Sequence, residues 1–327
     1  MTRLNLALGL LAAVFFALSL LTGPAAYGPL DSLRALVAGG DEAAMIVMRE
    51  IRLPRALLGL LIGFSLGASG AVLQGFLRNP LAEPGIVGVS ASASFGAVAV
   101  FYSGLAGASV LALPAGALAG ALLSVLVLLA IAARRSSTLT LILAGVALTS
   151  LAGALTSLAL NLSPNPFASY EIIFWLLGSL KDRSMLHVWV ALPLMLAGWA
   201  LLMASRRALD ALSLGEEGAA SLGIDMTRAR RAVVVGVALA VGAATAVAGA
   251  IGFVGLVVPH LIRPLTNRLP GSLVVPAGLG GAALLLAADV AVRIAIPARE
   301  LNVGVLTALI GAPFFLWLVM RVRREGP

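Results

Sequence analysis

The chain has 327 residues, of which 61% are hydrophobic and only 11% are charged. A soluble domain carries about 25% charged residues, so this composition excludes a protein whose main solvent is water. The sequence contains no cysteine and two histidines, which excludes disulfides, thiolate metal sites and multi-histidine metal sites. Its net charge of +8 comes from arginines at the ends of apolar runs, a pattern typical of membrane proteins and not of nucleic-acid-binding surfaces.

Apolar stretches of about 20 residues, enough to cross a hydrocarbon core of about 30 Å, recur along the whole chain. They predict an all-α integral membrane protein with about ten transmembrane helices in a single domain, 1–327. The expected spans are 4–22, 54–77, 86–102, 114–133, 139–160, 187–205, 232–250, 252–267, 270–292 and 301–320. The eighth is the least regular, because Pro259 and Pro264 interrupt it.

The first expected span also has features of a signal peptide, with Arg3 before an apolar core and small residues around 24–28. Its uncharged stretch of 19 residues is longer than the usual apolar core of roughly 7 to 15 residues. We therefore expect a retained helix, followed by an outer connection that reaches residue 50.

Arginine distribution predicts the orientation of the spans. With ten spans both termini lie on one side, and that side collects most of the arginines, whereas nine spans would export the cluster at 321–324. Both termini and the loop 206–231 are therefore expected in the cytoplasm. The arginines on that side are Arg3, Arg78, Arg134, Arg135, Arg206, Arg207, Arg228, Arg230, Arg231, Arg268, Arg321, Arg323 and Arg324.

A faint internal repeat links the two halves of the chain. The segment 69–77, followed by Pro80 and Pro84, resembles the segment 248–254, followed by Pro259 and Pro264. The first segment descends into the cytoplasm and the second ascends from it. Inverted repeats with broken helices are typical of transporters, so spans 2–5 are expected to correspond to spans 7–10.

Nine short segments, in order along the chain, resemble the FecCD family of ABC importer permeases, the type II group. They are IRLPR at 51–55, RNPLAEPG at 78–85, LAGV at 143–146, WLLGS at 175–179, LSLGEE at 212–217, ASLG at 220–223, GFVGLVVPH at 252–260, ELNVG at 300–304 and GAPFF at 311–315.

The resemblance implies a homodimer in the bacterial inner membrane, with two cytoplasmic ATPase subunits and a periplasmic substrate-binding protein. It also implies a metal-chelate substrate, such as a ferric siderophore, haem or a corrinoid. The sequence has no GxxxxGK[ST] phosphate-binding loop. ATP and Mg²⁺ are therefore expected in the partner ATPase, and no cofactor, metal or catalytic residue is expected in this chain.

The cytoplasmic loop is expected to form short helical pieces between 208 and 223, broken at Gly215, Gly218 and Gly223. By the resemblance, these pieces are coupling helices that dock on the ATPase. An ordinary surface loop with a helix cap is the alternative. The residues that match the family's coupling motif are Gly215, Glu216, Glu217, Ala220, Leu222 and Gly223.

Three arginines, Arg52, Arg55 and Arg293, lie at the outer ends of the second and ninth expected spans. The resemblance implies that they receive glutamates from the two lobes of the binding protein, and a guanidinium suits this role because it pairs bidentately with a carboxylate. The alternative is anchoring at the membrane interface. Asp289 lies one helical turn before Arg293, so it is expected to pair with this arginine and orient it.

The translocation pathway is expected along the fifth and tenth spans. Candidate lining residues are Thr149, Thr156 and Asn161, with Asn302 and Thr307 opposite. These side chains can equally form hydrogen bonds between helices. His260, a tempting haem ligand, is expected to have a structural role beside the proline break.

Two other classes of function compete with an ABC permease. An ion-coupled secondary transporter would need carboxylates at mid-membrane, and Asp289, near a membrane face, is the only intramembrane candidate. A membrane enzyme would need a catalytic cluster, and the sequence shows none. The substrate stays open among haem, catecholate or hydroxamate siderophores, corrinoids and a molybdate-type oxyanion, and the turn 264–271 departs from the pattern of many family members.

Overall fold

The computed structural model describes residues 1–325 except 26, 40, 133–137, 164–165 and 296–300. Arg134, Arg135 and Glu300 therefore lie outside the described residues. All regular elements of the described part are helices. They are α1 (Thr2–Leu21), α2 (Pro29–Val37), α3 (Glu42–Ile46), η1 (Val47–Arg52), α4 (Leu53–Phe76), η2 (Pro84–Val87), α5 (Val89–Tyr102), η3 (Leu105–Gly107), α6 (Ala112–Ala132), α7 (Thr138–Asn161), α8 (Pro166–Leu176), α9 (Met185–Ala204), α10 (Arg206–Leu212), α11 (Glu216–Ser221), α12 (Met226–Ala248), α13 (Val254–Ile262), η4 (Arg263–Leu265), α14 (Pro270–Ala295) and α15 (Val303–Glu325).

Each expected span coincides with a helix, and the expected all-helical membrane fold is confirmed. Seven helical segments are long and apolar enough to cross a membrane: α1, the continuous segment 42–76 that ends in α4, α6, α7, α9, α12 and α14. Three shorter apolar segments, α5, α13 with η4, and α15, occupy the third, eighth and tenth expected spans. That all ten cross the membrane stays a prediction.

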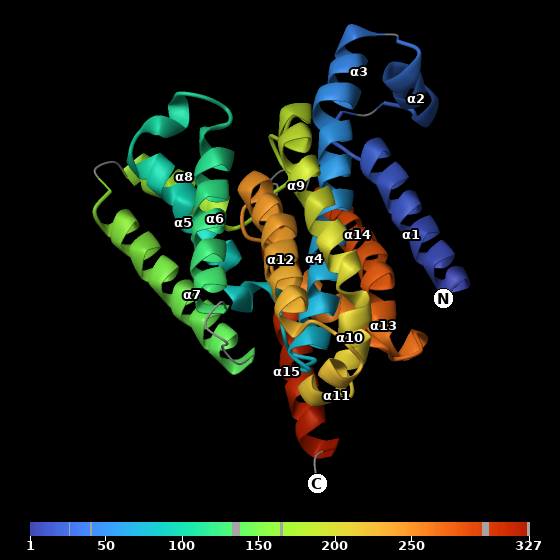
Figure 1. The fold of residues 1–327 in the computed structure, drawn as a ribbon. Helices are drawn as coiled ribbons and strands as arrows, with labels where there is room; N and C mark the ends of the chain where they lie inside the picture. The colour runs from blue at the N-terminus through green and yellow to red at the C-terminus, as the bar shows by residue number, and fades with distance from the viewer. Residues whose placement is uncertain (26, 40, 133–137, 164–165, 296–300, 326–327) are drawn as a thin grey trace.

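Helix α4 lies at the centre of the bundle, between α14, α12 and α9 (Figure 1). Its glycines permit this position, because a side-chain carbon on Gly63 would collide with the carbonyl oxygen of Gly281, and one on Gly67 with that of Ala277. Such small-residue contacts let helices pack closely in lipid. By contrast α1 lies at the edge of the bundle and packs mainly along α14.

The seventh expected span starts earlier than predicted. Helix α12 begins at Met226 and not at 232, because the carboxylate of Asp225 caps its first turn. One oxygen of this carboxylate accepts the N–H groups of Thr227 and Arg228, each at 3.0 Å. An aspartate at this position satisfies N–H groups that a helix start leaves without partners, so the basic residues that follow it become helical.

The connection between the first two spans is more ordered than expected. It contains α2, α3 and η1, and the last two run directly into α4, so that this helix projects beyond the bundle (Figure 1). Asp41 caps α3 by accepting the N–H of Ala44 at 3.2 Å.

Another helix that was not expected, α8, lies between α7 and α9 along the chain. These helices are too short to be seen as apolar spans, which explains why the sequence did not reveal them.

The first segment of the faint repeat lies against α13, the helix that follows the second segment. A side-chain carbon on Gly70 would collide with the carbonyl oxygen of Gly255, so α4 and α13 meet backbone to backbone. The Gln74 amide donates to the carbonyl of Leu256 at 3.3 Å and accepts from Arg263 Nη2 at 2.8 Å. These contacts join the segment 69–77 to α13 and to Arg263 just after it. The inverted symmetry itself stays a prediction.

Candidate functional site

A cavity of about 310 Å³ opens at the end of the bundle where α1 ends and α4 begins. We call it the outer hollow. All three arginines of the expected docking site line it, together with the loop 180–184 that precedes α9. Sequence positions 52, 55 and 293 are therefore brought to one site, as expected. The lining residues include five basic and two acidic ones. The lining therefore has a net positive charge, which attracts negatively charged groups.

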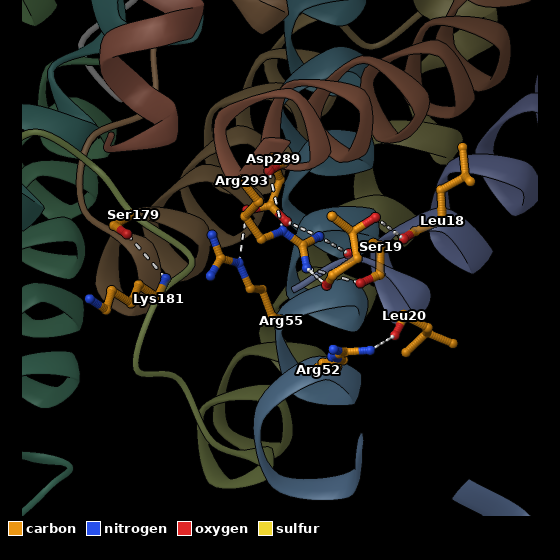
Figure 2. Close-up of polar contacts among 10 residues, drawn as sticks. Leu18, Ser19, Leu20, Arg52, Arg55, Ser179, Lys181, Asp289 and Arg293 are labelled. Carbon is orange, nitrogen blue, oxygen red and sulfur yellow. Dashed lines mark hydrogen bonds and ion pairs between the residues drawn. The ribbon is translucent and has the colours of Figure 1, made fainter. Parts of the chain in front are cut away.

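The carboxylate of Asp289 lies behind the hollow between two arginines (Figure 2). Its Oδ1 accepts from Arg55 Nε at 2.9 Å, and its Oδ2 forms an ion pair with Arg293 Nη2 at 2.7 Å. Asp289 is only 1% exposed. The expected pairing of Asp289 with Arg293, one helical turn away, is confirmed. The contact of Asp289 with Arg55 was not predicted from the sequence, and it connects α14 to α4.

Two of the arginines also hold the end of α1. The last carbonyl groups of a helix lack partners within it, and a cation near them is favourable. Arg293 Nη1 donates to the carbonyls of Ser19 at 3.0 Å and Thr22 at 2.7 Å, and its Nη2 donates to Ser19 Oγ at 2.7 Å. Arg52 donates to the carbonyls of Leu20 at 3.0 Å, Leu21 at 3.3 Å and Ala25 at 2.5 Å.

This arrangement differs from the exposed patch that the sequence suggested. Arg52 is 3% exposed, Arg55 9% and Arg293 8%. Each already donates to acceptors of its own chain, and Figure 2 shows the three guanidinium groups gathered beside the end of α1. No sequence pattern indicates this contact, because α1 is distant along the chain and contributes only backbone carbonyls and Ser19 to it. Docking of a binding protein on these arginines stays a prediction, and it requires that a partner side chain enters the hollow.

The expected coupling loop lies at the opposite end of the bundle, where α10 and α11 form a short helical pair (Figure 1). Gly215 and Gly223 adopt positive φ angles of 93° and 80° and bound α11. The expected break at Gly218 is wrong, because α11 runs through it from Glu216 to Ser221. A glycine inside a helix costs only about 1 kcal/mol and does not have to end it.

The surface of this loop is open to solvent. Its exposed residues include five of the six expected coupling residues, and Leu222 is 63% exposed. They are Glu216, Glu217, Ala220, Leu222 and Gly223. Two hydrogen bonds connect α10 to the first turn of α14. Arg206 Nε donates to the carbonyl of Gly271 at 2.6 Å, and the N–H of Gly271 donates to Asp210 Oδ1 at 2.7 Å. A partner could therefore reach these exposed coupling residues from solvent.

The expected pathway residues are spread over α7, the turn before α15 and α15 itself. Thr149 donates to the carbonyl of Gly145 at 2.9 Å, and Thr307, which is buried, donates to that of Gly304 at 3.0 Å. Asn302 donates to the carbonyl of Phe174 at 3.2 Å. The remaining two lie on α7, where Thr156 is half-buried and Asn161 is exposed. Hydrogen bonds thus occupy three of the five side chains, and their role in the pathway stays a prediction.

A second polar cavity, of about 260 Å³, is lined by Thr149 and by Glu83, a residue that the sequence analysis did not single out. Glu83 accepts the N–H of Phe253 at 2.5 Å, in the break between α12 and α13. Burial raises the pKa of this carboxyl group, and the hydrogen bond from Phe253 opposes that shift. Phe253 has φ of 67°, so this contact holds a left-handed residue in place.

The described residues contain no group of three metal-binding side chains. The ring of His260 packs edge-on against that of Phe314, with 5.7 Å between the ring centroids. This contact agrees with the structural role expected for His260.

Comparison with known proteins gives a consistent result. A model of the FecCD transport family matches residues 10–321. The chain is 43% identical over 283 residues to the cobalamin import system permease protein BtuC of Halobacterium salinarum, covering 86% of this chain and 75% of the relative. It is 39% identical over 328 residues to the vitamin B12 import system permease protein BtuC of Salmonella paratyphi A, covering 98% and 96%.

The fold is also similar to a solved structure. That protein, assigned to the metal-chelate type of ABC transporters, was solved in an inward-facing conformation, and it superimposes with a TM-score of 0.87 at 31% sequence identity. The match covers 98% of this chain and all of the other. The agreement therefore extends over the outer hollow, the coupling loop and the helices between them.

Proposed function

The chain belongs to the FecCD transport family and is a permease subunit of an ABC importer, and we propose that its substrate is a metal chelate, with a corrinoid such as cobalamin as the first candidate. Identities of 39% and 43% to permeases named for cobalamin or vitamin B12 import carry this proposal. Ferric siderophores and haem are the next candidates, because they too are metal chelates, the substrate type named for the similar solved structure.

Energy for transport would come from a separate ATPase that docks on the coupling loop. The exposed groups of α11 and its flanking glycines support this assignment, and the sequence has no phosphate-binding loop of its own. Two ATPase subunits would serve a homodimer of this chain in the inner membrane, with both termini in the cytoplasm. ATP and Mg²⁺ would then be bound by those subunits.

A periplasmic binding protein would deliver the chelate to the outer hollow. The concentration of basic residues there supports docking of acidic side chains through Arg52, Arg55 and Arg293. An ion-coupled transporter is disfavoured by the family assignment. It is also disfavoured because both oxygens of the Asp289 carboxylate are already engaged by guanidinium groups of the same chain.

Reconstitution tests the proposal. Proteoliposomes that contain this chain and its ATPase, supplied with the binding protein and ATP, should accumulate cyanocobalamin, and excess haem or ferric siderophore should not compete. Accumulation without any ATPase would contradict an ABC permease. Competition by a siderophore but not by a corrinoid would contradict the proposed substrate.

A charge reversal tests the coupling loop in the same assay. Glu217→Arg should lower ATP-driven uptake at least tenfold, because a surface residue of the docking loop changes sign while nothing in the core is disturbed. Glu42→Arg, an equally exposed reversal at the outer end, is the matched control and should leave uptake close to that of the wild type. Equal uptake by both variants would remove Glu217 from the ATPase interface.

A further inference from the structure

The wall of the outer hollow opposite α1 is formed by the loop between α8 and α9. The chain at Ser179 and Lys181 passes beside Arg55 and Arg293 in Figure 2. Two hydrogen bonds from backbone N–H groups fix the start of this loop. The N–H of Ser179 donates to the carbonyl of Ala248 at 2.7 Å, and the N–H of Lys181 donates to Ser179 Oγ at 3.1 Å. These bonds fix the backbone at the start of the loop, at the edge of the hollow.

Arg183 lies on this wall and differs from the other arginines of the hollow. Its Nε is buried and has no hydrogen-bond partner among the described residues. Burial lowers the pKa of the Arg183 guanidinium, and the neighbouring charge of Asp182 only partly opposes this shift. A buried donor without an acceptor is costly, and the cost is larger when the donor carries charge. An acceptor supplied from outside the chain would remove this cost.

We propose that Arg183 is a fourth docking residue, which receives a carboxylate of the periplasmic binding protein when that side chain enters the outer hollow. The inference rests on the proposed function, because the permease role supplies the partner. A guanidinium offers Nε and Nη donors in one plane, which match the two oxygens of a carboxylate. Arg52 and Arg293 already hold carbonyls of α1, so Arg183 is the arginine of the hollow with a buried donor to offer.

The occupant is a protein carboxylate and not a free anion, because the hollow lies at the end of the bundle that would face the binding protein. Its cationic lining is continuous with the three arginines of the expected docking site. Opposite charge on a binding protein would be attracted to the whole hollow, and the partly buried position of Arg183 would favour the carboxylate that penetrates furthest. Free carboxylate binding is tested separately below.

Affinity of the binding protein for the permease in nanodiscs is the first test. Arg183→Gln should weaken binding about tenfold to a hundredfold, as removal of a buried charged partner does at interfaces. Arg183→Lys, which keeps the charge but loses the planar fork, should fall between this variant and the wild type. Arg34→Gln removes an exposed arginine of α2 outside the hollow and should bind like the wild type. Wild-type affinity for Arg183→Gln, with an unchanged thermal midpoint, would overturn the proposal.

Labelling gives an independent readout, because the natural chain contains no cysteine. Glu50 is exposed and lines the hollow, whereas Asp31 is exposed on α2 outside it. The binding protein should slow maleimide labelling of Glu50→Cys but not of Asp31→Cys, and adding Arg183→Gln should restore fast labelling at the same protein concentration. Equal protection with and without Arg183→Gln, or equal protection by sodium acetate alone, would contradict a protein carboxylate at Arg183.

Failure of this inference can be separated from failure of the proposed function. If wild-type proteoliposomes accumulate the chelate with ATP but Arg183→Gln binds normally, only the assignment of Arg183 is wrong. If the wild type shows no ATP-driven uptake and no affinity for the binding protein, the proposed function itself is wrong.

Discussion

The two ends of α14 differ in how their polar groups are satisfied. At the outer end, Asp289 and Arg293 are buried and bonded to α1 and α4. At the other end, Gly271 is held by Arg206 and Asp210, and the coupling loop beyond them exposes its carboxylates. A partner can therefore reach the coupling loop from solvent, whereas a partner at the outer end must enter a hollow lined by buried arginines that already donate to acceptors of the same chain.

This difference gives α14 a specific role. One helix of 26 residues carries both attachments, and it packs along the central helix α4 over its glycine contacts. Coupling between distant sites requires an element that both sites bias, and α14 is the helix that the two attachments share. Breaking the attachment at each end separately tests whether the two ends contribute differently.

The largest effect is expected at the outer end. Asp289→Ala should destabilise the protein by about 3 to 5 kcal/mol, because it leaves two buried guanidinium groups without their carboxylate. Thermal unfolding in detergent measures this change, and Asp31→Ala, which removes an exposed carboxylate of α2, is the control. A midpoint for Asp289→Ala equal to that of the control would mean that the buried ion pairs do not stabilise the fold.

A smaller effect on stability, but a clear one on coupling, is expected at the opposite end. Asp210→Ala removes the acceptor of the Gly271 N–H and should cost about 1 to 3 kcal/mol. It should also lower the stimulation of ATP hydrolysis by the binding protein while leaving the affinity for that protein unchanged. Asp210→Asn keeps the accepting oxygen and is the matched control. Full stimulation in Asp210→Ala would show that this attachment does not transmit the signal.

Much of the fold could be predicted because the membrane imposes a length on each apolar run. All ten expected spans coincide with helices, since about 20 apolar residues leave few other structures in lipid. The start of α12 was missed because a single capping residue, Asp225, extends the helix beyond its apolar part. The break at Gly218 was wrong because a glycine permits a turn without requiring one.

The site was predictable in composition but not in geometry. Arg52, Arg55 and Arg293 could be grouped from their positions at the outer ends of spans, and the one-turn spacing gave the pair of Asp289 and Arg293. The burial of Arg52 and Arg293 could not be foreseen, because it involves contacts with α1 over 31 to 274 residues of sequence. The buried Nε of Arg183, unpaired among the described residues, could not be predicted from the sequence either, because it results from how the surrounding structure packs around the loop 180–184.

The smallest predicted effect concerns Glu83, which bridges the loop before α5 and the break before α13. Because burial raises the pKa of its carboxyl group in the folded protein, the folded state holds the Glu83 proton at pH values where the unfolded chain, with a pKa of about 4.3, has released it. Its contribution to stability should therefore fall as the pH rises from about 4.3 through the folded pKa, and then stay constant.

Glu83→Gln should abolish this dependence while keeping an oxygen that accepts the N–H of Phe253. The thermal midpoint of the wild type should fall relative to that of the variant across this pH range. Glu42→Gln, at an exposed carboxylate of α3, is the control and should follow the wild type at every pH. A wild-type midpoint that instead rises relative to Glu83→Gln with pH would mean that the hydrogen bond from Phe253 outweighs burial and that the carboxylate is the stabilised form.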